Sequence, residues 1–182
     1  MHPPTFCTRR LIGIAVGACV AALAPATALA AAASLPAPAA VATSAPRCTT
    51  AGLVVWLDTQ GNGAAGSIYY DLELTNLSGR ACTLLGYPGV SAVNLGGHQL
   101  GSAASRDSVR KPRVVTIASD ATAVAVLQIV DADNFPSAVC RPTTAAGLRV
   151  YPPNQTASKV VPYPFLACSR PGPVYLSVQA VR

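Results

Sequence analysis

The sequence predicts an all-β fold, an antiparallel immunoglobulin-like β-sandwich with two disulfides, from three observations. Short apolar runs rich in β-branched residues recur between turn clusters in residues 48–182. Four cysteines remain in this part of the chain, behind an N-terminal segment typical of export. Only 11% of the 182 residues are charged, against roughly 25% in an average soluble domain. This composition excludes a coiled coil and a typical charged helical bundle.

Residues 1–30 predict a cleavable signal peptide. The Arg9-Arg10 pair precedes a long uncharged run, and Ala28–Ala30 supplies the small-x-small pattern of a signal peptidase site. A membrane anchor is the competing interpretation, but it needs about 20 strongly apolar residues, and here Pro25 interrupts a run that is mostly alanine. A lipid anchor at Cys19 is the weaker alternative, because the residues after it stay apolar. We expect a secreted or cell-wall-associated protein with no transmembrane segment in the mature chain.

Residues 31–47 predict an Ala/Pro-rich linker. They lack apolar periodicity and carry no charge before Arg47, so they cannot bury enough surface to offset the entropy of ordering. Proline favours an extended spacer. Residues 48–182 then leave 182 − 47 = 135 residues, enough for one domain that buries roughly two-thirds of its unfolded surface.

The cysteines of this domain predict two disulfides, because an even number of cysteines in an exported chain is typical of a disulfide framework. They are Cys48, Cys82, Cys140 and Cys168. Their wide spacing contains no C-x-x-C pair, and His98 is the one histidine left in the domain, so we expect no metal site. Closure of local loops favours Cys48–Cys82 and Cys140–Cys168, but four cysteines allow three connectivities and the sequence alone does not decide.

The strands follow from hydrophobic alternation. Ser67–Asn76 places apolar and polar side chains on opposite faces with a period of two. Six further β-branched runs are expected as strands: Leu53–Leu57, Val90–Val93, Val114–Ile117, Thr122–Val130, Leu148–Tyr151 and Val174–Val181. Trp56 lies too close to Cys48 for a true immunoglobulin domain, and Leu166 stands where that fold has a tyrosine. The likeness therefore concerns architecture only.

Several short motifs resemble catalytic or ligand-binding motifs, but the neighbouring sequence does not support such a role. Gly61–Gly66 matches G-x-G-x-x-G, but a strand follows it where a dinucleotide site needs a helix, so we expect a loop between strands. His98 lacks a nucleophile motif, and Asp71 and Glu73 share one polar strand face. Asp131–Asn134 lacks the glycine and glutamate of an EF-hand and is interpreted as an Asx turn. We predict no catalytic residue, no cofactor and no metal.

Residues 106–113 form the one dense charge cluster of the domain. Its cations are Arg106, Arg110, Lys111 and Arg113. Pro112 disfavours helix at the residue before it, so we expect a protruding loop ahead of the strand at Val114. An anionic partner, such as a wall polymer, would make contact here first, through an attraction screened over about 10 Å at 0.1 M salt. Nucleic acid is not expected, because it normally needs a wider basic face with stacking aromatics.

The exposed tyrosines are expected to be scattered, without a stacking platform for a sugar: Tyr69, Tyr87, Tyr151, Tyr163 and Tyr175. Leu72–Cys82 reads L-E-L-T-N-L-S-G-R-A-C, and Gly86–Val90 reads G-Y-P-G-V. Together with Cys140, Leu148–Pro153 and Cys168, this pattern resembles actinobacterial exported proteins that carry the domain of unknown function 4232, over about the whole of residues 48–182. The resemblance implies an exported or lipid-anchored β-sandwich and brings no catalytic residue, ligand or substrate.

These observations favour a non-enzymatic binding module of the cell envelope or medium, with an envelope polymer or an extracellular protein as its partner. The alternative is a secreted inhibitor of a protease or other enzyme, because small disulfide-braced β domains often present a rigid loop. An exposed convex loop beside a disulfide would favour the inhibitor. A concave pocket containing His98 would favour a hydrolase instead.

Overall fold

The computed structural model describes residues 44–182, and its strands lie largely where the apolar alternation predicts them. β2 (Ser67–Asn76), β7 (Val114–Ile117) and β8 (Thr122–Val130) have the predicted bounds. β4 (Gly89–Val93) and β11 (Leu176–Gln179) differ from them by one or two residues at an end. β2 and β8 bury alternate side chains, as strands with one core-facing side do. The predicted all-β fold is confirmed.

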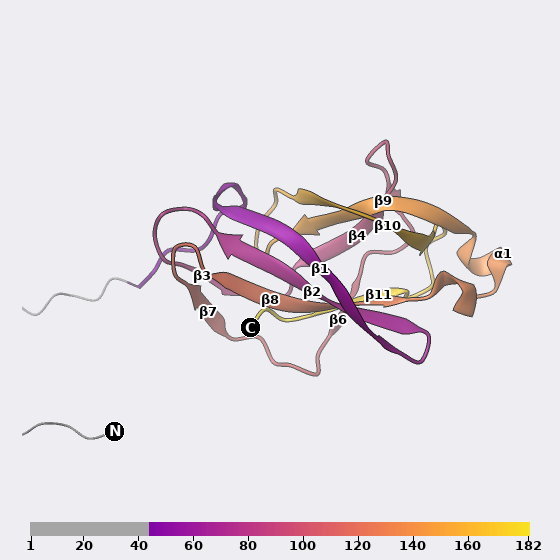
Figure 1. The fold of residues 1–182 in the computed structure, drawn as a ribbon, viewed down its shortest axis with the longest axis horizontal. Coiled ribbons are helices and arrows are strands. Elements are labelled where there is room, and N and C mark those ends of the chain that lie inside the picture. Colours follow the sequence, from indigo (N-terminus) through magenta and orange to yellow (C-terminus); the bar gives the residue numbers. More distant parts are fainter. Residues whose placement is uncertain (1–43) are drawn as a thin grey trace, which may run out of the picture. The chain divides into compact units, whose positions relative to one another are not determined.

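Two sheets form a β-sandwich (Figure 1). One sheet has the order β1-β2-β8-β11-β6 and the other the order β10-β9-β4-β5, while β3 and β7 pair separately. The remaining strands are β1 (Leu53–Ala64), β3 (Cys82–Leu85), β5 (Gln99–Leu100), β6 (Ser105–Asp107), β9 (Pro142–Tyr151) and β10 (Lys159–Cys168). Three short helical turns complete the described chain: η1 (Thr50–Gly52), η2 (Ala132–Asn134) and α1 (Ser137–Cys140). The pairing is antiparallel except for β6, which runs parallel to β11.

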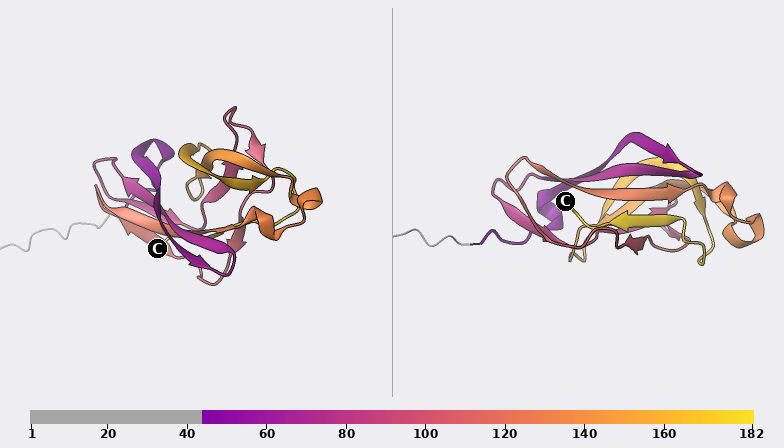
Figure 2. Two further views of the ribbon diagram at one scale, coloured as in Figure 1. Left: turned by 45° about the vertical axis from the view of Figure 1, so that its right-hand side comes forward. Right: turned by 90° about the horizontal axis from the view of Figure 1, so that it is seen from below.

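The core lies between the inner faces of the two sheets, whose layers Figure 2 shows from two directions. Leu72 of β2 and Leu127 of β8 pack from one sheet, and Leu148 of β9 packs from the other; all three are fully buried. Each such leucine contributes roughly 1.5–3 kcal/mol by leaving water. The sandwich is therefore held mainly by aliphatic burial.

Two disulfides close loops at different places in the sandwich. The structure contains Cys48–Cys82 and Cys140–Cys168, which confirms the favoured pairing. The sequence separations are 34 and 28 residues, and loops of this size correspond to about 3–4 kcal/mol each in the loop-entropy model. Disulfides persist in oxidising surroundings, so the pairing indicates an extracellular or otherwise oxidising compartment.

The sequence misplaced some strand boundaries. The loop expected over Gly61–Gly66 is wrong for its first part, because β1 continues to Ala64 and the turn is Ala65-Gly66. β10 was missed because Pro162 and Pro164 lie within it, and proline is rare in strands. β10 tolerates them as the edge strand of its sheet. The short strands β3, β5 and β6 were missed because two to four residues are too few to show an apolar alternation.

The predicted signal peptide and most of the predicted linker lie outside the described residues. Pro46, near the end of that linker, already accepts a hydrogen bond from the backbone N–H of Thr83 at 2.8 Å. Arg47 forms an isolated β-bridge with the same residue. Between Ser44 and Arg182, no helix is long and apolar enough to cross a membrane.

Candidate functional site

A cavity of about 480 Å³ opens between the two sheets, at the end of the sandwich where β1 turns into β2. We call it the hairpin-end pocket. It is lined by Gly63–Ile68 and Tyr70 of the hairpin, Ile129–Asp131 at the end of β8, and Tyr163, Phe165 and Leu166 of β10. Its volume lies within the range of small-molecule sites, roughly 300–1,000 Å³. The pocket is thus the concave feature on which a function can be built.

An irregularity in β1 shapes one wall of this pocket. The register between β1 and β2 shifts between Asp58 and Asn62, where β1 carries extra residues. Gly61 lies in this bulge, and a Cβ there would stand 2.6 Å from the Tyr70 ring and 2.5 Å from Ile68. The Tyr70 ring therefore packs directly over the bulged backbone. Bulges commonly re-aim side chains next to functional sites.

A second irregularity, in β10, shapes the opposite wall. The register between β10 and β9 shifts between Pro162 and Phe165, so the proline-flanked Tyr163 lies in a bulge. Gly147 of β9 pairs with Pro162, and a Cβ on this glycine would stand 2.3 Å from the Val161 carbonyl oxygen. Only a residue without a side chain allows this close approach of the two backbones. Gly147 therefore helps to position Tyr163.

The two bulges bring aromatic side chains from different sheets together. The Tyr163 hydroxyl donates a hydrogen bond to the Tyr70 hydroxyl, and the two rings meet edge to face with centroids 5.2 Å apart. Tyr163 also stacks on Phe165 at 5.9 Å. Burial first, and then the hydrogen bond to Tyr70, raise the pKa of the Tyr163 hydroxyl to about 12. The Tyr163 phenol is therefore expected to stay neutral near neutral pH.

Charge is confined to the rim of the pocket. Asp131 is exposed, and its Oδ1 accepts a hydrogen bond from the N–H of Asp133 at 3.0 Å, as in the predicted Asx turn. The interior is apolar: Ile68 stays 42% exposed on the core-facing side of β2, and Ile129 lies opposite it in β8. An apolar surface that faces inward but is open to solvent is suited to bind an apolar group.

At the opposite end of the β1–β2 hairpin, where β1 begins and β2 ends, a buried polar side chain fills the space beside the strands. Asn76 is fully buried, and its amide nitrogen lies 2.8–3.0 Å from the carbonyl oxygens of Arg80, Ile117 and Ala118. Its Oδ1 accepts hydrogen bonds from both the backbone N–H and the hydroxyl of Ser78. Every polar atom of the Asn76 side chain is thus used. We call this region the Asn76 end.

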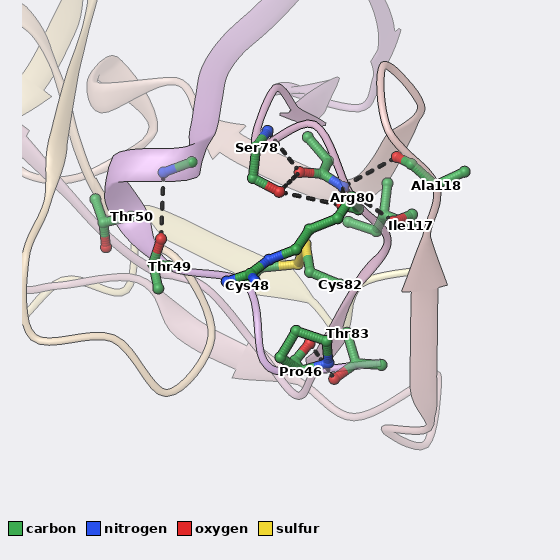
Figure 3. The surroundings of a disulfide bond; sticks show 12 residues. Pro46, Cys48, Thr49, Thr50, Ser78, Arg80, Cys82, Thr83, Ile117 and Ala118 are labelled. Atoms are coloured by element: carbon green, nitrogen blue, oxygen red, sulfur yellow. Dashed lines mark hydrogen bonds between the residues drawn. A yellow bond between two sulfur atoms is a disulfide. The ribbon is translucent and has the colours of Figure 1, made fainter. Parts of the chain in front are cut away.

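Figure 3 shows how the first disulfide lies within this network. Cys48 and Cys82 lie beside Ser78 and Arg80, close to Ile117 and Ala118. The nearby cavity is only about 30 Å³, about the volume share of one water molecule in the liquid. The L-T-N-x-S-G-x-x-C run therefore builds a structural joint that contains the Asn76 hydrogen bonds and the first disulfide.

The predicted basic cluster needs one correction. Arg106 does not lie in a protruding loop: it belongs to β6, paired with Val178, and its guanidinium lies 5.6 Å from the centroid of the Tyr87 ring. Asp107 holds this strand in place, because Gln179 donates a hydrogen bond to its Oδ2 at 3.0 Å. The irregular segment is residues 108–113, which contains the other three cations, Arg110, Lys111 and Arg113. All four cationic residues are exposed.

The remaining sequence candidates lie apart from the pocket. His98 is exposed in the turn between β4 and β5. Asp71 and Glu73 lie on the outer face of β2, where burial first, and then Asp58 and Asp71, raise the pKa of Glu73. Asp71 also forms an ion pair with Arg182 at 3.3 Å. Asp58, Asp71 and Arg182 line a separate hollow of about 270 Å³ on this outer sheet face.

The tyrosines were the least well predicted residues. Tyr175 is not exposed: it is fully buried, and its hydroxyl donates to the Leu100 carbonyl oxygen at 2.9 Å. Tyr163 is not isolated, because it joins Tyr70 and Phe165 in the pocket wall. The available signal was the Pro-Tyr-Pro-Phe run, since two prolines around an aromatic residue favour an irregular edge strand.

The fold and the two disulfides define the class: a disulfide-braced β-sandwich domain of an oxidising compartment. Residues 48–182 match the family described as Domain of unknown function (DUF4232), and the chain belongs to this family. The resemblance seen in the sequence is confirmed at this level. No curated protein and no solved structure is detectably similar to the chain.

Proposed function

We propose that this protein is a non-enzymatic binding module of the cell envelope or the surrounding medium, and that its binding site is the hairpin-end pocket. The observation that carries the proposal is the cavity of about 480 Å³ between the sheets, walled by Tyr70, Tyr163 and Phe165. Pockets that combine apolar and aromatic walls with a few convergent polar groups are typical ligand sites.

The chemistry of the pocket supports binding over catalysis. Its convergent polar groups are the hydroxyls of Tyr70 and Tyr163, and the pKa of Tyr163 is about 12. A general base works best with a pKa near the working pH, so this phenol is a poor base near neutrality. The same hydroxyls are effective hydrogen-bonding groups for holding a ligand.

Location outside the cytoplasm is supported by two independent features. The N-terminal 30 residues have the order of a signal peptide, and the domain carries two disulfides. Attachment to the cell wall and free release are both compatible with these features.

The inhibitor alternative has less support. It would use a rigid convex loop beside a disulfide, such as the segment after Cys168. There the backbone N–H of Ser169 donates to the Arg141 carbonyl oxygen, and the side chain of Arg170 donates to that of Ala138 at 3.1 Å. These bonds hold the segment against α1, so the pocket is the better candidate for recognition.

The proposal is tested by blocking the pocket with a large side chain. Ile68→Trp places an indole in the cavity, and Val54→Trp is its matched control on the outer face of β1, because the two residues are 42% and 45% exposed. The probe is prodan, an uncharged naphthalene ketone whose fluorescence rises in apolar sites. We expect Ile68→Trp to weaken binding at least tenfold and Val54→Trp to leave it within twofold. Equal binding by both variants would contradict the proposal.

A further inference from the structure

We infer that the hairpin-end pocket takes an uncharged ligand with an apolar body and one hydrogen-bond acceptor, and that the Tyr70 hydroxyl proton binds this acceptor. The inference deepens the proposed function and rests on it. It follows from the hydrogen bonds, the charges and the exposed apolar surface of the pocket.

Of the two hydroxyl protons of the tyrosine pair, one has no hydrogen-bond acceptor among the described residues. A phenol hydroxyl has one proton to donate and can also accept. Tyr163 uses its proton on the Tyr70 oxygen. Between Ser44 and Arg182 the Tyr70 hydroxyl makes no other hydrogen bond, so its own proton has no protein acceptor. Because Tyr70 lines the pocket while its ring is largely buried, the hydroxyl is held in a fixed position from which it can donate to a ligand acceptor.

The charges around the pocket select against an ionised ligand. The charged side chain that lines it is Asp131, which would repel an anion. A cation would be drawn to the exposed rim where Asp131 lies, but not into the apolar interior beside Ile129, because burying an unpaired charge is strongly unfavourable. A neutral acceptor, such as a ketone, ester, amide or ether oxygen, avoids both costs.

The walls of the pocket determine the size and polarity of the ligand's apolar body. The exposed part of Ile68, together with Phe165 and Leu166, offers apolar surface on both sides of the tyrosine pair. Covering this surface removes it from water at about 25 cal/mol per Å². A cavity of about 480 Å³ suits a fused-ring or branched aliphatic body more than an extended polymer.

Three naphthalene probes separate these requirements. Prodan carries one ketone acceptor, 2-dimethylaminonaphthalene lacks it, and 6-dimethylamino-2-naphthoic acid replaces it with a carboxylate. One hydrogen bond corresponds to about a fivefold gain in affinity. We therefore expect the full-length protein to bind prodan about fivefold more tightly than 2-dimethylaminonaphthalene, and to bind the acid most weakly.

Two conservative variants test whether the preference for prodan over 2-dimethylaminonaphthalene depends on the Tyr70 hydroxyl proton. Tyr70→Phe keeps the ring but removes the unpaired donor, so the prodan preference should fall to about one. Tyr69→Phe is the matched control: Tyr69 is the neighbouring tyrosine on the outer face of β2 and does not line the pocket, so the preference should persist. Prodan emission, which shifts to longer wavelength when its ketone is hydrogen-bonded, should shift back only in Tyr70→Phe.

The outcomes separate this inference from the proposed function. If the neutral probes bind and Ile68→Trp blocks them, but Tyr70→Phe keeps the same preference, the inference is wrong and the proposed function stands. Binding of the acid as tight as that of prodan also overturns the inference. If none of the three probes binds the parent protein, both fail.

Discussion

The two ends of the β1–β2 hairpin use their polar groups in opposite ways. At the Asn76 end, one buried amide nitrogen lies within hydrogen-bond distance of three carbonyl oxygens, the amide oxygen accepts from two donors, and the cavity measures about 30 Å³. At the hairpin end, a tyrosine pair leaves a proton over, and the cavity measures about 480 Å³. Complete pairing gives rigidity, whereas an unused donor beside apolar surface gives a capacity to bind.

The recognisable family motif and the pocket lie in different parts of the fold. The residues Leu72–Cys82 carry the recognisable pattern, and they end at the Asn76 network and the Cys48–Cys82 disulfide. The pocket is lined by residues from three distant segments, the hairpin, the end of β8 and β10. A short signature can mark a joint of the fold while the site lies elsewhere.

The largest expected effect is loss of the disulfide at the Asn76 end. The double variant Cys48→Ala, Cys82→Ala opens a loop of 34 residues, which should lower the free energy of unfolding by about 4 kcal/mol. Urea unfolding measures this. At temperatures where the variant remains folded, prodan affinity should stay within twofold, since the pocket is at the other end. A loss of binding in the folded variant would show that the two ends are coupled.

The next effect concerns Asn76 itself. Asn76→Ala leaves buried carbonyls and the Ser78 N–H without partners, at an expected cost of about 3 kcal/mol. Asn62→Ala is the matched control, because Asn62 is exposed in the paired strand β1, and it should change stability by less than about 0.5 kcal/mol. A similar small change in both variants would mean that the network is not the structural joint described.

Features that depend on residues close together in the sequence could be predicted, whereas features that depend on contacts between distant segments could not. β2 and β8 could be predicted because strand alternation is local. Closure of local loops favoured the observed disulfide pairing over its two alternatives but did not decide it. Tyr163 and Tyr70 could not be paired in advance, because their contact depends on two bulges in separate sheets. Arg106 was misplaced because its strand depends on pairing with the distant β11.

A substitution at the hairpin end should affect stability and binding together. Gly147→Ala places a Cβ against the Val161 backbone, which should cost about 2 kcal/mol and displace the bulge that holds Tyr163. Gly89→Ala is the control in the same sheet, because its Cβ would make only ordinary contacts of 3.5 Å or more with Tyr151. We expect weaker prodan binding only in Gly147→Ala. Unchanged prodan binding by Gly147→Ala would show that the β10 bulge does not shape the pocket.

The raised pKa values of two tyrosines predict that the free energy of unfolding falls in alkaline solution. The pKa values of Tyr163 and Tyr175 are raised from 10.0 to about 12, in both cases chiefly by burial. The folded state therefore holds these protons more tightly than the unfolded state. Their stabilising contribution is complete below pH 10 and is lost as the pH rises towards 12.

Urea unfolding between pH 9 and pH 12 measures this decline. Tyr163→Phe should make the decline shallower, and the remainder should come from Tyr175, whose hydroxyl bonds to the core-side carbonyl of Leu100. A decline equal to that of the parent would mean that Tyr163 is not held by Tyr70 in solution.

The smallest effect concerns the exposed cations near β6. Changing Arg106, Arg110, Lys111 and Arg113 to Ser should reduce retention on isolated cell walls at low salt by a few-fold and have no effect at 1 M salt, where charges are screened within about 3 Å. Prodan affinity should not change, because these residues do not line the pocket. Equal retention of parent and variant at low salt would leave the cluster as an ordinary solvated surface.

Titration of prodan into the ¹⁵N-labelled protein distinguishes an end of the sandwich that binds a ligand from an end that holds the fold together. We predict that the amide shifts concentrate in the segments that line the pocket, at Gly63–Tyr70, Ile129–Asp131, Tyr163, Phe165 and Leu166. The amides of Asn76–Cys82 should remain in place. Saturable shifts centred on Asn76–Cys82, with the hairpin-end pocket unchanged, would place the binding site at the Asn76 end instead.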